Sequence, residues 1–170
     1  MEADQACLRE LDTQAVAYKH VPLAGGMRTP IEIGGPIDGI TLVARGRRSA
    51  VMDCVLARAL VQAGGVFKEL GITTLAFSAA FDHRTRRGSN EASAHAYGLA
   101  IDVDPFQNPY RSGQRVLPEL ATAYLDRGRH LPGMITADSP VVAAFRAVGW
   151  TWGGGWSSPT DLMHFSSTGH

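Results

Sequence analysis

The segment SAHAYGLAID, residues 93–102, places a histidine at a turn and an aspartate seven residues later. The segment 97–103 is short and apolar, which predicts a strand whose only charged residue is Asp102. A lone carboxylate at the end of an apolar strand costs free energy to bury unless it is paired, hydrogen-bonded or coordinated. We therefore expect His95 and Asp102 to point into one cleft.

A second pair of polar residues lies near the C-terminus, where DLMHF, residues 161–165, places Asp161 three residues before His164. Catalytic zinc sites use imidazole and carboxylate ligands, three from the protein, and keep an open position for water. We predict that His95, Asp102 and His164 hold one zinc ion, although another divalent ion can use the same ligands. Asp161 is then the base that activates the attacking water, as the glutamate of HExxH does.

Each of these features has a simpler interpretation when it is taken alone. A histidine in a loop is usually a surface residue, and an aspartate three residues before a histidine is a common coincidence. The prediction of a metal site therefore depends on the motifs occurring together in one chain.

Other candidate residues flank these motifs. Arg84 follows an expected strand, and a fixed guanidinium can stabilise charge on a scissile carbonyl oxygen; the alternative is a solvated loop arginine, which we expect for Arg86 and Arg87. The tryptophans of the run 150–156 are either a core edge or a substrate wall, with the core favoured for Trp150. The remaining histidines are expected to be structural or surface residues: His20, His83, His130 and His170.

The middle of the chain predicts a helix from Ser49 with a stop at Gly71 and a kink at Gly64-Gly65, because glycine lowers helix propensity by roughly 1 kcal/mol. Its apolar face comprises Met52, Val55, Leu56, Ala59, Leu60, Ala63, Phe67 and Leu70. A strand at residues 40–44 precedes it, and an alternating strand at 72–81 follows it. Residues 22–39 are rich in turn formers and predict loops between short strands.

Two further helices are expected at residues 117–127 and 139–148, the second capped by Ser139 and ended by Gly149, before a last strand at 162–165. Helices and strands do not alternate regularly. The sequence therefore predicts a single α+β domain with a central antiparallel sheet flanked by helices and a zinc site in a cleft on the sheet.

The composition excludes some classes of protein. The 170 residues carry 16 basic and 16 acidic side chains, so no global field favours nucleic acid or an anionic membrane surface. No apolar run approaches the roughly 20 residues of a membrane-spanning helix, and the start lacks the order of a signal peptide, so the compartment is not predicted. Cys7 and Cys54 form no metal-binding motif; they can pair in an oxidising compartment, but Cys54 lies on an apolar helix face, which favours a buried thiol.

Three blocks of the sequence resemble a known family: residues 77–84, residues 93–110, and residues 149–165. They are similar to the zinc D-alanyl-D-alanine carboxypeptidases and L-alanyl-D-glutamate peptidases, which include phage endolysins and vancomycin-resistance dipeptidases. The likeness spans roughly residues 50–165. The middle of the chain also resembles extensin-like domains.

The resemblance implies a zinc site of His95, Asp102 and His164, with Asp161 as general base, Arg84 polarising the scissile carbonyl and Ser93 contacting substrate. Some family members have glutamate in place of Asp161. Residues 1–48 match nothing in the family, so we expect an N-terminal extension or subdomain packed on a peptidase domain at residues 49–170.

The predicted function is zinc-dependent hydrolysis of a peptide bond in peptidoglycan stem peptides, as a D-Ala-D-Ala carboxypeptidase or an L-Ala-D-Glu endopeptidase. The expected partner is the stem peptide, not nucleic acid, and the expected state is a monomer that acts at the bacterial cell wall. The alternative is a catalytically silent zinc-binding module that recognises wall peptides. Asp161 favours the enzyme, because a silent module has no use for a base beside the metal.

Overall fold

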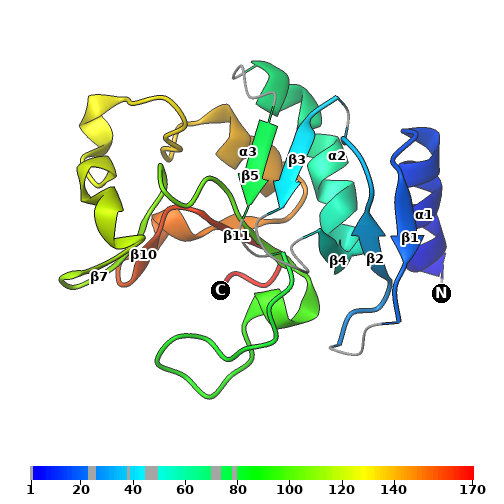
Figure 1. Cartoon of the computed structure of the whole chain (residues 1–170), viewed down its shortest axis with the longest axis horizontal. Helices are drawn as coiled ribbons and strands as arrows, with labels where there is room; N and C mark the ends of the chain where they lie inside the picture. Colours follow the sequence, from blue (N-terminus) through cyan, green and yellow to red (C-terminus); the bar gives the residue numbers. More distant parts are fainter. Residues whose placement is uncertain (1, 23–25, 38, 45–49, 70–73, 78–79) are drawn as a thin grey trace.

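The computed structural model describes residues 2–22, 26–37, 39–44, 50–69, 74–77 and 80–170. The chain forms the predicted α+β domain. Figure 1 shows helix α2 (Cys54–Glu69) near the middle of the molecule, with α1 (Glu2–Thr13) at one edge and the strand β7 (Tyr110–Ser112) at the other. Helix α2 packs against both α1 and α3 (Pro140–Ala147).

The strands of the described residues form several small sheets. One antiparallel sheet has the order β6 (Ala100–Asp102), β11 (His164–Ser166), β9 (Thr151–Trp152). A second has the order β10 (Thr160–Asp161), β7, β8 (Arg115–Leu117). A third has the order β1 (Tyr18–His20), β2 (Pro30–Ile33), β4 (Val51–Asp53). The antiparallel prediction holds for these three sheets, whereas β3 (Thr41–Ala44) and β5 (Thr74–Phe77) pair in parallel.

The hydrophobic core fixes the strand that carries His164. Phe165 is completely buried, and its ring stacks on that of Phe145 of α3, with the ring centres 4.3 Å apart. Phe67 of α2 meets Phe145 edge-on at 5.9 Å. Successive side chains of a strand point to opposite faces, so the burial of Phe165 in the core directs His164 away from it.

The helix expected from Ser49 begins later than predicted, at Cys54. Residues 51–53 instead form β4, because they pair with β2, which is distant in sequence. The helix then continues to Glu69 without the predicted break at Gly64-Gly65. The neighbouring Ala63 and Phe67 are buried, and their packing offsets the low propensity of the glycines. The predicted stop at Gly71 lies outside the described residues.

The prediction of a helix at residues 117–127 is also wrong. Leu117 ends β8 and is followed by two 3-10 helices, η2 (Glu119–Tyr124) and η3 (Arg127–Arg129). Asp126 caps the second one by accepting a hydrogen bond from the Gly128 amide at 3.1 Å, which begins a new element where a longer helix would continue.

The helix expected at 139–148 is confirmed as α3, with Ser139 at its N-cap position. The Ser139 hydroxyl, however, accepts from the amide of Thr136, at 2.8 Å, and not from a helix amide. The strands predicted at 40–44, 72–81, 97–103 and 162–165 appear in shorter form as β3, β5, β6 and β11. Residues 72, 73, 78 and 79 lie outside the described residues.

The N-terminal helix α1 was not predicted, and it is joined to the start of α2 by a disulfide. Cys7 and Cys54 are both buried, with their sulfur atoms 2.09 Å apart, so the expectation of a free buried thiol is wrong. Pairing depends on α1 packing against α2, a contact that sequence spacing does not reveal. The division of the chain at residue 48 stays a prediction. Within the described part of the chain, no helix has the length and apolar character needed to cross a membrane.

Candidate metal centre

His95 lies on a short 3-10 helix, η1 (Ala94–Tyr97), whose ends are both fixed. At the start, the Ser93 hydroxyl accepts a hydrogen bond from the His95 amide at 3.3 Å. At the end, Gly98 adopts a φ of 66°, and the Asp53 amide donates to the Gly98 carbonyl at 3.1 Å. A Cβ on Gly98 would lie 2.7 Å from the Asp53 amide nitrogen, so only glycine permits this close approach.

Strand pairing brings Asp102 and His164 together, because His164 of β11 lies directly opposite Asp102 of β6 in the antiparallel register. His164 Nδ1 is 3.2 Å from Asp102 Oδ1, and His95 Nε2 is 3.3 Å from the same oxygen. The two imidazole rings meet edge to face, with their centres 5.1 Å apart. All three residues are buried.

These residues fit a metal ion on two grounds. One potential ligand atom from each of His95, Asp102 and His164 lies within 4.8 Å of the others. Both ring nitrogens of His95 and Nε2 of His164 are buried and have no hydrogen-bond partner among the described residues. Buried polar atoms are normally satisfied, so unsatisfied nitrogens that converge beside a carboxylate are what a cation site requires.

The electrostatics of Asp102 agree with a cation site. Burial raises the pKa of Asp102, but the charges and contacts of His95 and His164 outweigh burial and hold that pKa well below its usual range. The carboxylate is therefore ionised and available as a ligand.

Asp161 occupies a different electrostatic environment. It lies on β10 opposite Tyr110 of β7, and its Oδ1 is buried with no hydrogen-bond partner in the part of the chain that the structure describes. Burial, followed by the negative charge of Asp102, raises the pKa of Asp161 to about 7, while the positive charges of His164, Arg87 and Arg84 oppose the rise. A carboxyl group with a pKa near neutrality can take up and release a proton during a reaction.

The glycine-rich run 153–155 allows the chain to pack closely behind Asp161. A Cβ on Gly153 would lie 2.6 Å from the Asp161 carbonyl oxygen. Nearby, the Trp152 indole donates to the Leu162 carbonyl at 2.8 Å. Trp150 and Trp152 are buried, as the core interpretation of Trp150 predicted.

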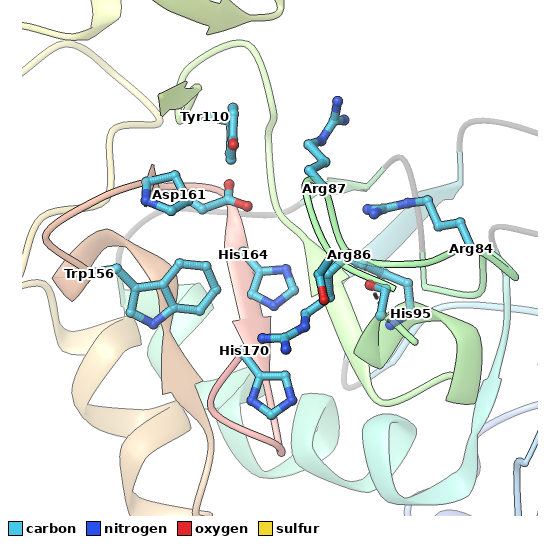
Figure 2. Close-up of a pocket in the computed structure, with 12 residues that line it drawn as sticks. Arg84, Arg86, Arg87, His95, Tyr110, Trp156, Asp161, His164 and His170 are labelled. Atoms are coloured by element: carbon cyan, nitrogen blue, oxygen red, sulfur yellow. Dashed lines mark hydrogen bonds between the residues drawn. The ribbon is translucent and has the colours of Figure 1, made fainter. Parts of the chain in front are cut away.

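A cleft of about 270 Å³ opens over these groups. Figure 2 shows Trp156, Asp161 and Tyr110 along one side, and Arg84, Arg87 and His95 along the other, with His164 between them. The cleft is lined by Arg84, Arg86, Arg87, Ser89, Ser93, His95, Tyr110, Trp156, Pro159, Asp161, His164 and His170. The predicted site residues therefore come together, with Asp102 buried beside the two histidines.

Two predicted substrate-contacting residues line the cleft. Arg84 is held at its Nε by Asp82, at 3.0 Å, and its Nη1 donates to the Thr85 carbonyl at 3.3 Å. Ser93 is buried, and its hydroxyl caps η1 by accepting the hydrogen bond from the His95 amide.

Sequence reasoning assigned no functional role to six of the lining residues, which include Ser89 and Pro159. We expected ordinary surface or structural roles for Arg86, Arg87 and His170. Tyr110 was noted only as part of the block at residues 93–110 that resembles the peptidase family. Nothing local in the sequence marks them, because a loop, a strand and the C-terminal residues bring them to the cleft from different parts of the chain.

Comparison with known proteins finds a similarity to a peptidase family. No curated protein matches the chain. Residues 87–167 match the family described as D-alanyl-D-alanine carboxypeptidase. This segment contains His95, Asp102, Asp161 and His164, whereas Arg84 lies just before it. Over residues 87–167, which are just under half of the chain, the protein is similar to the D-alanyl-D-alanine carboxypeptidase family.

Proposed function

We propose that this protein is a zinc metallopeptidase that hydrolyses a peptide bond in peptidoglycan stem peptides, of the D-Ala-D-Ala carboxypeptidase or L-Ala-D-Glu endopeptidase type. The observation that carries the proposal is the convergence of His95, Asp102 and His164, with ligand atoms within 4.8 Å, in a cleft that also contains Asp161. The family match over residues 87–167 supports the peptidase class and the wall-peptide substrate.

His95, Asp102 and His164 would hold the zinc. Imidazole nitrogen and carboxylate oxygen are ligands that zinc takes in catalytic sites, and the unsatisfied nitrogens of both histidines support their use. When bound, zinc supplies Lewis acidity to the scissile carbonyl and makes the attacking water more acidic.

Asp161 acts as the general base in this proposal. Its carboxylate takes the proton of the attacking water and then gives it to the nitrogen of the leaving amine, so the base is regenerated in each cycle. Burial raises the pKa of Asp161 to about 7 in the metal-free protein; the bound cation would lower this pKa, which keeps the carboxylate ionised and able to accept a proton near neutral pH. The buried, unsatisfied Oδ1 supports a role for this carboxyl group in the reaction, because a buried polar atom without a partner is costly.

Arg84 and Ser93 would position the substrate. Asp82 and the Thr85 carbonyl restrain the Arg84 guanidinium at the edge of the cleft, which leaves donors for the scissile carbonyl oxygen. Ser93 lines the same cleft next to His95. We also propose that the protein acts as a monomer at the bacterial cell wall and that residues 1–48 form an accessory part of a peptidase domain at 49–170.

The test begins with metal content. Wild-type protein should bind about one zinc ion per chain, and His95→Ala should lose it, whereas His20→Ala, which changes an exposed histidine on β1, should retain it. Release of products from stem peptides is then measured on the same samples. Failure of the wild-type protein to bind zinc when it is supplied would contradict the proposal.

A second variant separates the enzyme from a silent zinc-binding module. Asp161→Asn should still bind zinc but lose kcat by a factor on the order of 100 to 10,000, because the base is gone. Glu119→Gln, an exposed change on η2, is the matched control and should cleave normally. Zinc binding and wall-peptide binding without cleavage by the wild type would favour the silent module.

A further inference from the structure

Asp53 is a buried carboxylate that takes no part in the proposed reaction. Its Oδ2 accepts hydrogen bonds from the amides of Arg28, at 2.8 Å, and Thr29, at 3.1 Å. Its Oδ1 accepts from the amide of Val55, at 3.0 Å, in the first turn of α2. Burial of a carboxylate is costly unless its oxygens accept hydrogen bonds, and three amides offset that cost here. The side chain therefore connects β4 to the start of α2 and to residues 26–29, which we call the support loop.

The main chain of Asp53 extends this connection to η1, the helix that carries His95. The Asp53 amide donates to the Gly98 carbonyl at 3.1 Å, and the Gly98 amide donates to the His95 carbonyl at 3.2 Å. One residue, Gly98, thus stands between Asp53 and the proposed metal ligand in this series of hydrogen bonds. A shift of β4 would therefore be transmitted to His95.

The support loop also contacts η1 directly. A Cβ on Gly26 would lie 2.3 Å from the ring of Tyr97, and a Cβ on Gly98 would lie 2.5 Å from Met27 Sδ. At each position the absence of a side chain lets the two segments approach closely. Since two amides of the support loop bind the Asp53 carboxylate, one residue holds both segments that η1 contacts here, the loop and β4.

His95 depends on such contacts more than the other two proposed ligands do. Asp102 and His164 are register partners on β6 and β11, so the main-chain hydrogen bonds of one sheet fix their separation. His95 lies on a separate 3-10 helix of four residues. Its carbonyl also accepts from the Asp82 amide at 2.9 Å, but that bond and the Ser93 cap come from the segment that leads into η1. The contacts to β4 and the support loop connect η1 to the N-terminal part of the chain.

We propose that Asp53 is a positioning residue that sets the orientation of His95 in the metal centre, and that the support loop is part of the framework of that centre. The inference rests on the proposed function only through its metal site of His95, Asp102 and His164. Neither Asp53 nor the support loop lies within residues 87–167, the segment that is similar to the peptidase family. Zinc affinity therefore depends on residues outside that segment.

The test replaces the Asp53 carboxylate and measures zinc affinity by competition with a chromophoric chelator. Asp53→Ala removes all three acceptor bonds and frees the support loop. Its zinc affinity should fall about 10-fold, the lower end of the loss that follows removal of a group that orients a metal ligand. Asp53→Asn keeps an oxygen for the two amides of the support loop but presents to Val55 an NH2 group, which cannot accept. Its zinc affinity should lie between those of the wild type and Asp53→Ala.

Cobalt(II) in place of zinc gives a readout that a general loss of stability does not change. The visible absorption of cobalt depends on the number and geometry of its ligands. At saturating cobalt, Asp53→Ala should differ from the wild type in the position or intensity of this absorption, because the His95 imidazole no longer approaches the metal in the same orientation. The spectrum of Asp53→Asn should be closer to that of the wild type.

Two control variants separate positioning from stability. Asp126→Ala removes another carboxylate that accepts an amide hydrogen bond, from Gly128 at 3.1 Å, but this carboxylate caps η3. Leu11→Ala removes a fully buried side chain of α1 and leaves the hydrogen-bonding groups of Asp53 in place. Both variants should be less stable in urea and should retain the wild-type zinc affinity and cobalt spectrum.

Folded Asp53→Ala with wild-type zinc affinity and a wild-type cobalt spectrum would overturn the inference. A loss of zinc affinity in Leu11→Ala as large as that in Asp53→Ala would overturn it as well, because stability alone would then explain the effect. If Asp53→Ala does not fold, Asp53→Asn decides the question. Weaker zinc binding by this variant supports the positioning role, and wild-type affinity refutes it.

Release of products from stem peptides, measured on the same samples, separates this inference from the peptidase proposal. If the wild type binds zinc without cleaving the peptides, and Asp53→Ala binds zinc more weakly with an altered cobalt spectrum, the peptidase proposal fails and the positioning role stands. If the wild type cleaves the peptides, and Asp53→Ala binds zinc and cobalt as the wild type does, the peptidase proposal stands and the positioning role fails.

Discussion

Replacement of Gly98 by alanine tests how the fold positions His95. Gly98 has a φ of 66°, a conformation that costs an L-residue roughly 1–2 kcal/mol. The added Cβ would also lie 2.5 Å from Met27 Sδ and 2.7 Å from the Asp53 amide nitrogen. The Met27 side chain can move, but the Asp53 amide is main chain, so relief requires η1 to separate from β4.

That separation has an estimable cost. It breaks the 3.1 Å hydrogen bond from the Asp53 amide to the Gly98 carbonyl, which contributes about 1 kcal/mol. Together with the backbone strain, we expect Gly98→Ala to lower the free energy of unfolding by about 2–3 kcal/mol. Because His95 belongs to the displaced helix, zinc affinity should fall as well.

Gly113→Ala is the control for this prediction. Gly113 has a similar φ of 56°, but no heavy atom of the described residues lies within 4 Å of the position its Cβ would take. Gly113→Ala should therefore lower the free energy of unfolding only by the cost of the backbone conformation, roughly 1–2 kcal/mol, and should bind zinc normally. Both variants are unfolded in urea with a chelator present, and zinc affinity is titrated separately. Equal losses of stability, with unchanged zinc affinity in Gly98→Ala, would refute the role of this contact.

Three further predictions concern other parts of the molecule. The base must be ionised to accept a proton, so kcat/KM should rise with pH through the pKa of Asp161. That pKa is about 7 without metal and is lowered by the cation. A flat pH profile below pH 7, with the zinc content verified at each pH, would contradict this prediction. Reduction of the Cys7–Cys54 disulfide, whose cysteines are 47 residues apart, should lower the free energy of unfolding by up to about 4 kcal/mol, as measured in denaturant with and without reductant; the Cys7→Ser/Cys54→Ser variant should not respond. Phe165→Ala should cost about 3–5 kcal/mol in the same assay and weaken zinc binding, because the ring anchors the strand of His164; undiminished zinc affinity would show that the anchor is dispensable.

The sequence alone was sufficient to select the four residues of the predicted site. His95 and Asp102 lie in one short segment, and Asp161 and His164 lie in another, so their chemistry and spacing were visible before any tertiary contact was known. The structure then places His164 opposite Asp102 through strand pairing and brings ligand atoms of His95, Asp102 and His164 together, while Asp161 lines the same cleft as the two histidines. The α+β class followed from local periodicity in the same way.

Contacts between distant segments decided the features that sequence reasoning missed. Residues 51–53 are a strand and not the first turn of a helix, because β2 is there to pair with them. Cys54 is in a disulfide because α1, about fifty residues earlier, packs against α2. Both outcomes depend on the geometry of the whole chain, whereas helical periodicity reports only on neighbours three or four residues away.

The same distinction applies to the cleft. The sequence by itself determined which side chains are present for the proposed metal site and the proposed base, because ligand and acid–base chemistry belongs to side chains and short motifs. Only the tertiary structure decided that Arg87, Tyr110 and His170 line the cleft and that the Arg87 guanidinium lies over the Tyr110 ring. The physical reason is that charge pairing, desolvation and ring contacts depend on distances in space, which sequence separation does not fix.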